Sequence, residues 1–253
     1  MLLDSGRHDE ACEAFEHLLA LNPTDALAHG NLALGLKSRG QTAEAESHLR
    51  QAIALAPDFA EAHNNLGNLL TSQQRYEEAI GAFLHAMDIR PDYFEAVNNL
   101  GRAYADDFRF DEAIQCFEAL LAVQPDNSRT LNGLGSVLTQ QGRLADAAKL
   151  FMKALAVRFD DYDAHCNLGQ VALQMGDLGN GWDGYAQRFQ RENRPVRTRA
   201  FPMPWWDGSD LAGKSLLIWG EQGVGDEIRF ASVVPDAASG TKHCLLECDP
   251  RLT

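Results

Sequence analysis

Hydrophobic positions in this chain follow helical spacing and recur with a period of 34 residues. Within each period the apolar residues fall three and four positions apart, as they do on one face of an amphipathic helix. Four registers keep this period: Ala11, Ala45, Ala79, Ala113 and Ala147; Leu32, Leu66, Leu100, Leu134 and Leu168; Phe15, Leu49, Phe83, Phe117 and Phe151; and Pro23, Pro57, Pro91 and Pro125. Four registers in phase predict a repeated unit of two helices joined by a turn.

Each register has a physical role in such a unit. Gly67 on the first helix and Ala79 on the second helix let the two helices approach closely, and Phe83 fills the space left between them. A larger side chain at Ala79 would overpack this contact, at a typical cost of about 1–3 kcal/mol. Pro91 ends the second helix and sets the turn into the next unit.

This 34-residue helix–turn–helix unit resembles the tetratricopeptide-repeat (TPR) family. The resemblance implies an all-α solenoid, a right-handed superhelix of antiparallel helix pairs, over residues 1–189. A partial repeat over residues 1–25 precedes five units, which begin at Ala26, Ala60, Phe94, Ser128 and Tyr162. Met1 falls inside what would be the first helix of the partial repeat, which indicates a fragment or an internal start.

The last unit departs from the pattern. Gly181 replaces the alanine of its register, and Tyr185 replaces the phenylalanine. Terminal repeats are usually atypical because one of their faces has no neighbouring repeat. We therefore expect Trp182 and Tyr185 to pack against whatever follows the array.

Asparagine recurs at the fifth and sixth positions of the units. The residues are Asn31, Asn64, Asn65, Asn98, Asn99, Asn132 and Asn167. Asparagine is a poor residue for a helix interior, so its recurrence needs a reason. A side-chain amide both donates and accepts hydrogen bonds, and a row of them could hold an extended peptide in the concave groove lined by the first helices.

Residues 62–68 and 96–102 resemble the asparagine ladder in the TPR arm of O-linked N-acetylglucosamine transferase. That resemblance implies contact with the backbone of a bound peptide. Gly133 interrupts the row. An alternative role for the asparagines is to join neighbouring helices by hydrogen bonds, since most buried polar groups are satisfied internally.

Histidine and cysteine do not suggest a metal site. His29, His63 and His165 share the fourth position of their units, and helices about 10 Å across hold them too far apart to share a metal ion. We interpret them as packing residues. The cysteines are odd in number and contain no CxxC pair, which favours reduced, packed thiols in a cytoplasmic protein. They are Cys12, Cys116, Cys166, Cys244 and Cys248. We expect neither a metal nor a cofactor.

The charge of the chain narrows the class of partner. The formal net charge is −14, which would repel the phosphate backbone of a nucleic acid. No apolar run reaches the ~20 residues of a membrane-spanning helix, and the N-terminus lacks the pattern of a signal peptide. The expected partner is therefore a protein or an extended peptide, bound in the cytoplasm.

The composition changes after Phe189, and residues 190–214 read as a linker that contains tryptophan and arginine. Residues 188–199 hold five arginines against a single glutamate, Glu192. Such a run usually docks against an acidic neighbour or stays solvated. Contact with phosphate through the forked guanidinium is the alternative.

Residues 215–253 are predicted to begin an α/β domain. A strand over 215–220, a glycine-bearing loop over 221–226, a helix over 227–239 and a second strand over 242–249 make a β–α–β unit, the start of a truncated Rossmann-like fragment. Residues 208–215 match the P-loop pattern formally. Because they precede a strand instead of following one, we reject that interpretation.

This junction resembles bacterial proteins that fuse TPR arrays to a glycosyltransferase of the heptosyltransferase type. The matching residues are Trp206, Asp207, Gly208, Gly223, Gly225 and Asp226. The resemblance implies that Asp226 is the general base toward the sugar acceptor in an intact enzyme. Gly223 and Gly225 would let the loop approach a phosphate or another ligand closely. The alternative is that Asp226 only caps the helix that follows.

Two functions follow from these patterns. The first is a protein- or peptide-binding TPR scaffold. The alternative is the N-terminal part of a glycosyltransferase, in which the array presents the acceptor to a two-domain (GT-B-type) catalytic unit that is mostly missing here. The chain stops at Thr253 after two strands, so we expect it to be inactive alone. A nucleotide-sugar would bind only the full-length protein.

Overall fold

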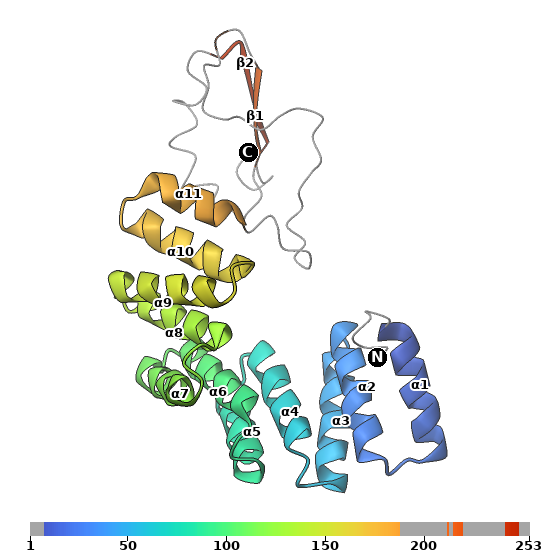
Figure 1. Ribbon diagram of the computed structural model, residues 1–253. Helices are drawn as coiled ribbons and strands as arrows, with labels where there is room; N and C mark the ends of the chain where they lie inside the picture. The colour runs from blue at the N-terminus through green and yellow to red at the C-terminus, as the bar shows by residue number, and fades with distance from the viewer. Residues whose placement is uncertain (1–7, 188–211, 213–214, 220–240, 248–253) are drawn as a thin grey trace. The chain divides into compact units, whose positions relative to one another are not determined.

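A computed structural model describes residues 8–187, 212, 215–219 and 241–247 of the chain (Figure 1). The chain divides into two compact units, Met1–Arg188 and Phe189–Thr253. The first is helical and the second contains the described strands, and each is considered by itself.

The helical unit contains eleven helices within residues 8–187. They are α1 His8–Leu21, α2 Ala26–Ser38, α3 Thr42–Leu55, α4 Ala60–Ser72, α5 Tyr76–Ile89, α6 Phe94–Asp106, α7 Phe110–Val123, α8 Ser128–Gln140, α9 Leu144–Val157, α10 Tyr162–Gln174 and α11 Leu178–Ala186. The even-numbered helices up to α10 begin at the five residues where the repeat units were predicted to start. We call these five the first helices, and the odd-numbered ones the second helices.

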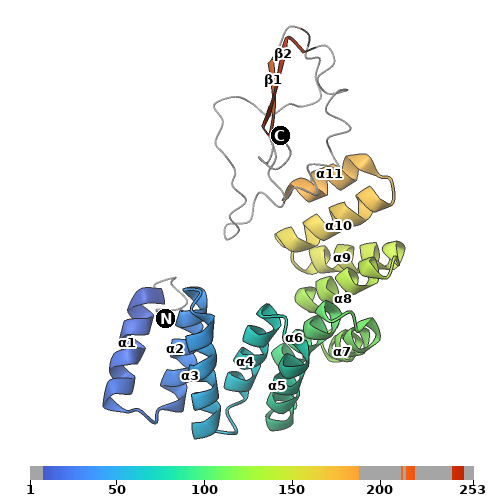
Figure 2. The same cartoon turned by 180° about the vertical axis from the view of Figure 1, so that it is seen from behind.

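Each helix packs against the next one in the chain, so the helices form a row of stacked pairs (Figures 1 and 2). This is the architecture of a TPR solenoid, as the 34-residue period predicted. Side chains cap several helix starts: Asp25 Oδ1 accepts from the N–H of Ala28, and Asn127 Oδ1 accepts from the N–H of Thr130. A cap of this kind satisfies one of the amide groups that a helix start leaves unpaired.

The alanine, glycine and phenylalanine registers form the core of each pair. Ala79 and Phe83 are fully buried. A Cβ atom added to Gly67 would lie 2.6 Å from the ring of Phe83, and one added to Gly101 would lie 2.8 Å from the ring of Phe117. Any side chain larger than that of glycine would therefore collide with the aromatic ring, which agrees with the close packing that the sequence pattern predicted.

The turn inside each pair contains one residue with positive φ. Glycine fills it in three units, whereas Gln74 (φ 62°) and Phe108 (φ 60°) fill it in the other two. Non-glycine residues reach this left-handed region at a cost. Phe108 is 77% exposed, so little burial compensates its backbone strain.

The C-terminal unit contains two described strands, β1 Ser215–Trp219 and β2 His243–Glu247. They pair in parallel, with Ser215 opposite His243 and Trp219 opposite Glu247. Both strands lie where the sequence predicted them. The predicted loop over 221–226, the predicted helix over 227–239 and the arginine-containing segment 188–199 lie outside the described residues.

Candidate protein-interaction face

The first helices form one continuous face of the array. Successive first helices contact each other directly, α2 with α4, α4 with α6, α6 with α8 and α8 with α10. Among the described residues, contacts between successive second helices are fewer or absent. The first helices therefore lie closer together, which places them on the inner side of the curved row.

Charge separates the two layers of helices. The second helices carry 14 acidic residues against 3 basic ones, whereas the first helices carry 4 acidic residues against 3 basic ones. The acidity of the chain is therefore concentrated on the second helices. The first-helix face is close to neutral, and its polar groups are mainly amides and hydroxyls.

Asparagines join neighbouring first helices at two steps of this face. The Nδ2 group of Asn99 on α6 donates to Oδ1 of Asn64 on α4 over 2.9 Å. The Nδ2 group of Asn167 on α10 donates to Oδ1 of Asn132 on α8 over the same distance. In each pair the fifth position of one unit meets the sixth position of the next. Helix-to-helix bonding, the alternative role considered from the sequence, is thus what the structure shows for these four residues.

The pairing is interrupted between α6 and α8. Asn98 occupies the fifth position of its unit, and the sixth position of the next unit is Gly133. Asn98 is buried, with 3% of its surface exposed, and its Oδ1 atom has no hydrogen-bond partner. A Cβ atom at Gly133 would lie 2.9 Å from the ring of Phe117, so this glycine is required by packing. The step from α6 to α8 therefore lacks the side-chain N–H donor that asparagine supplies at the α4–α6 and α8–α10 steps.

The predicted asparagines differ in how much of their surface is exposed. Asn64 and Asn99 are buried, like Asn98, with 1% and 3% of their surface exposed. Asn31 and Asn65 are half-buried, and among the hydrogen bonds of the described residues neither side chain is paired with another asparagine. Among the hydrogen bonds of the described residues, Asn31, Asn65 and Asn98 make none with their side chains, and these three lie on α2, α4 and α6.

Two cations lie on the same face. Partial burial lowers the pKa of Lys37 on α2, and the positive charge of Arg102 on α6 lowers it further. Burial also raises the pKa of Asp106, an effect that the charge of Arg102 partly offsets. Lys37 and Arg102 belong to units two apart, so the first helices bring charges from distant repeats within electrostatic reach of each other.

The histidines at the fourth position hold the turns between units. Nε2 of His63 donates to the carbonyl oxygen of Pro57 over 3.1 Å, and Nε2 of His165 donates to that of Phe159 over 2.8 Å. His29 contacts Pro23 in the same way, over 3.1 Å, and its Nδ1 lies 2.7 Å from Nδ1 of His48. These bonds give the histidines the structural role that the sequence suggested. In the part of the chain that the structure describes, no His, Cys, Asp and Glu side chains group as metal ligands.

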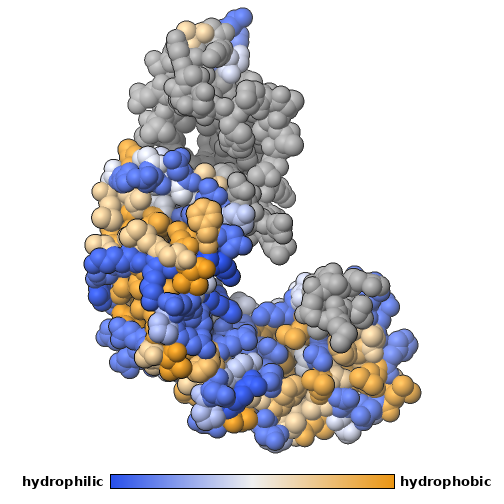
Figure 3. Space-filling model, in the orientation of Figure 1, coloured by the Kyte–Doolittle hydropathy of each residue, from blue (hydrophilic) through white to orange (hydrophobic). Residues whose placement is uncertain are grey.

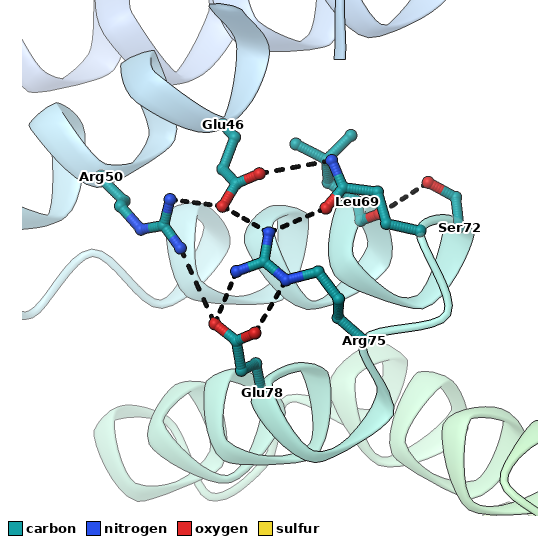
Figure 4. A network of polar contacts seen from close by, with 7 residues as sticks. Glu46, Arg50, Leu69, Ser72, Arg75 and Glu78 are labelled. Carbon is teal, nitrogen blue, oxygen red and sulfur yellow. Dashed lines mark hydrogen bonds and ion pairs between the residues drawn. The ribbon is translucent and has the colours of Figure 1, made fainter. Parts of the chain in front are cut away.

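A polar network between units was missed at the sequence level (Figure 4). Glu46 on α3 is 8% exposed and accepts from Arg75, over 2.8 Å, and from Gln73. It also forms an ion pair with Arg50, and Arg75 in turn pairs with Glu78 over 2.6 Å. Burial raises the pKa of Glu46, but the hydrogen bonds from Arg75 and Gln73 and the charge of Arg50 outweigh it and hold the pKa below its usual value.

A sequence signal for this network exists. Arginine recurs before the second helix of three units, at Arg75, Arg109 and Arg143. Arg109 pairs with Glu112 over 2.9 Å and with Glu77 of the preceding unit over 3.2 Å. The recurrence of a charged residue in phase with the repeat could have predicted a bridge between units.

The cysteines of the described residues are free thiols, as expected. Burial raises the pKa of Cys116 to about 11, which keeps this thiol protonated and unreactive. Cys248 lies outside the described residues, as do Gly223, Gly225 and Asp226.

Trp182 and Tyr185 contact each other, with ring centroids 6.1 Å apart. No helix in the described part of the chain is long and apolar enough to cross a membrane.

Known proteins share this repeat. Family models described as tetratricopeptide repeat match residues 1–25, 58–126 and 98–164, and one described as TPR repeat matches 36–73. Protein FlbA of Caulobacter vibrioides is 42% identical over 59 residues, which are 23% of this chain and 10% of FlbA. The chain thus spans a small part of that relative.

Solved structures show the same fold. PilW, a type IV pilus biogenesis factor, is 24% identical with a TM-score of 0.67, over 75% of this chain and 88% of PilW. YrrB, described as a TPR protein with an unusual peptide-binding site, is 20% identical with a TM-score of 0.51, over 71% of this chain and 92% of YrrB. At these identities the similarity shows the fold alone. Because the TPR family models together match more than half of its residues, this chain belongs to the tetratricopeptide-repeat family.

Proposed function

We propose that the chain is a protein-interaction scaffold whose first-helix face binds an extended peptide segment of a partner protein. The observation that carries this proposal is a pair of buried Oδ1 atoms on α6, those of Asn98 and Asn99, neither of which has a hydrogen-bond partner. A buried acceptor without a donor costs about 1–3 kcal/mol. A backbone N–H of a bound peptide would supply the donor that Gly133 cannot.

The surroundings of Asn98 support an extended, sequence-tolerant ligand. Asn31 and Asn65 add half-buried amides along the same face, and amides can both donate to and accept from a peptide backbone. The face is nearly neutral, so charge attraction is not its main means of recognition. The relative YrrB is described as having a peptide-binding site, which supports a ligand of this class.

The roles proposed for the seven asparagines differ. Asn64, Asn99, Asn132 and Asn167 hold the first helices at a fixed spacing, and their remaining donors and acceptors take a secondary part in binding. Asn31, Asn65 and Asn98 make the main contacts with the peptide. In this proposal the asparagines line the groove, as predicted from the sequence, and four of them also join neighbouring first helices.

Peptide selection tests the proposal. Twelve-residue peptides selected on the full chain from a random display library would be measured by fluorescence polarisation against wild-type, Asn98→Ala, Asn65→Ala and, as a control on α11, Asn180→Ala. We expect each of the first two changes to weaken binding about 10-fold, the equivalent of one hydrogen bond, and the control to have no effect. Equal affinity for all four proteins would contradict the assignment.

The parallel pairing of β1 and β2 favours a second candidate function. Parallel strands need a crossover connection of a dozen or more residues, usually a helix, and residues 220–242 are long enough to supply one. This is consistent with a β–α–β start of a glycosyltransferase-like domain, in which Gly223 and Gly225 would approach the ligand and Asp226 would act as the general base. In a protein with a complete catalytic domain, Asp226→Asn should then lower the rate of sugar transfer about 10²–10⁴-fold. Undiminished transfer would reduce Asp226 to a helix cap.

A further inference from the structure

The last residue of every second helix from α1 to α9 is a large, exposed aliphatic residue. These residues are Leu21, Leu55, Ile89, Val123 and Val157, and 86%, 42%, 37%, 64% and 46% of their surfaces are exposed. They stand at the turns between second helices and the following first helices, over residues 21–27, 55–61, 89–95, 123–129 and 157–163. We call this set of turns the proline edge, because four of them contain the periodic proline.

Exposed apolar residues gather along this edge. Of the 15 large hydrophobic residues that are exposed in the described part of the chain, eight belong to it, since Leu27, Phe159 and Tyr162 join the five aliphatic residues. In both views of the ribbon, the α1–α2 and α3–α4 turns lie on the same side of the array (Figures 1 and 2). The space-filling view shows apolar patches among hydrophilic surface over the helical unit (Figure 3). Clustered exposed apolar residues mark interaction sites more often than scattered ones do.

Helix stability does not explain these aliphatic residues. The carboxyl end of a helix carries partial negative charge and favours lysine or arginine in its last turn. None of α1, α3, α5, α7 and α9 has a basic residue there. Arginine follows as the C-cap residue of α5 and α9, at Arg90 and Arg158, but no cation stands at the C-cap of α3 or α7. The cation, where present, therefore accompanies the aliphatic residue and does not replace it.

The charge of the edge is negative. An exposed aspartate follows three residues after four of the aliphatic residues, at Asp58, Asp92, Asp126 and Asp160. Asp126 pairs with Lys153 over 3.5 Å, whereas the structure pairs none of the other three with a cation of the described residues. Two of the three arginines of the edge are occupied: Arg90 pairs with Glu61 and stacks on Tyr93, and Arg158 pairs with Asp161. The third, Arg129, is exposed, and the acidic residues of the edge outnumber these three cations.

We propose that the proline edge binds a basic amphipathic helix of a partner protein. Aliphatic residues of the edge would contact the apolar face of that helix, and Asp58, Asp92 and Asp160 would meet the lysines or arginines that flank it. An anionic lipid surface fits poorly because the edge is itself acidic. A second copy of this chain fits poorly for the same reason, given its net charge of −14. This surface is separate from the first-helix face, so the two proposals stand or fall independently.

A designed helix tests this proposal. The probe is an 18-residue fluorescent peptide with leucine along one face and lysine on both flanks. One control peptide has the same composition scrambled so that no apolar face remains, and another has every lysine replaced by glutamate. Binding to the full chain is followed by fluorescence polarisation at 50 mM and 300 mM salt. The protein variants are Val123→Ser with Val157→Ser, Asp92→Asn with Asp160→Asn and, as controls, Phe108→Ser on the opposite turn and Asn65→Ala on the first-helix face.

We expect the amphipathic probe to bind wild-type protein at least 10-fold more tightly than either control peptide. Each double variant at the edge should weaken this binding at least 10-fold, and higher salt should weaken it as well because it screens the aspartates. The two control variants should bind like the wild type. All of these positions are exposed except the half-buried Asn65, and unchanged circular dichroism would show that the variants fold. Equal binding of the scrambled peptide, or edge variants that bind like the wild type, would overturn the proposal.

Discussion

Asn99 and Asn64 are 35 residues apart in the chain, yet the Nδ2 group of Asn99 donates to Oδ1 of Asn64 over 2.9 Å, with both side chains buried. This bond locks α6 against α4 at the first-helix face. Asn98, next to Asn99, lies at a step where Gly133 leaves its Oδ1 without a donor, and the Oδ1 of Asn99 is also buried without a partner. Asn99 differs from Asn98 in that its Nδ2 group is bonded to a neighbouring helix. Adjacent asparagines of one helix thus have different tasks.

Replacement of these asparagines should separate the two tasks. Asn99→Ala leaves Oδ1 of Asn64 buried without a donor, and should lower the free energy of unfolding by about 1–3 kcal/mol. Asn98→Ala breaks no side-chain hydrogen bond among the described residues and should cost less. Urea denaturation of both variants measures the difference. A larger loss for Asn98→Ala than for Asn99→Ala would show that the pair is not what stabilises this step.

Two glycines of one unit should respond in opposite directions to alanine. Gly67→Ala places a Cβ atom 2.6 Å from the ring of Phe83, whereas Gly81→Ala meets nothing within 4 Å. We expect Gly67→Ala to destabilise the protein by about 1–3 kcal/mol through overpacking, and Gly81→Ala to stabilise it by up to about 1 kcal/mol through helix propensity. Thermal unfolding of the two variants tests this, and shifts of the same sign would contradict it.

Phe108 should be replaceable by glycine with a gain in stability. Its φ of 60° lies in the left-handed region, where a residue with a Cβ atom costs about 1–2 kcal/mol, and its side chain is mostly exposed. Phe108→Gly is therefore expected to raise the free energy of unfolding by about 1 kcal/mol.

The reverse change at an equivalent turn is the matched control. Gly142 has a φ of 76° and open space around it, so Gly142→Phe should lower stability by a similar amount. Urea denaturation of both variants gives the comparison. A loss of stability in Phe108→Gly would mean that contacts such as the one between the rings of Phe108 and Phe110, 6.1 Å apart, outweigh the strain.

The polar network around Glu46 should make stability fall in acid. The folded state holds the pKa of Glu46 below its ordinary value of 4.5, so the unfolded chain binds the proton more readily. The stabilisation is complete above about pH 4.5 and is lost as the pH falls through the lower folded pKa. Glu46→Gln should cost about 1.5–3 kcal/mol at pH 7, typical of hydrogen bonds to a charged group. Its penalty should shrink between pH 5 and pH 3, as followed by urea denaturation. A penalty independent of pH would show that the carboxylate charge is not responsible.

The contact between His29 and His48 should also make stability depend on pH, in a higher pH range than the network around Glu46. Burial lowers the pKa of His48 below its ordinary value of 6.5, and the nearby His29 lowers it further. The unfolded chain therefore takes up the proton first, so stability is complete above about pH 6.5 and declines as the pH falls below it. His48→Asn should flatten this decline between pH 7 and pH 5 in thermal unfolding experiments. A decline as steep as that of the wild type would assign the effect to other groups.

The sequence by itself determined the helices and their order. Helices α2, α4, α6, α8 and α10 begin at the residues that the 34-residue period indicates, because helix formation follows local apolar spacing. The fit between Gly67 and Phe83 was also readable, since one residue must be small where another is large. For β1 and β2 the apolar runs were sufficient to locate both strands.

Only the tertiary structure decided which polar groups meet. The sequence left the asparagines between peptide contact and helix-to-helix bonding, because the partner of a side-chain amide depends on distances between helices that no local pattern contains. The fold pairs Asn64 with Asn99 and leaves Asn98 unpaired, and it brings Arg75 to Glu46 across 29 residues of chain. Hydrophobic periodicity is a property of each segment, whereas a hydrogen bond between repeats depends on how closely the helices stack.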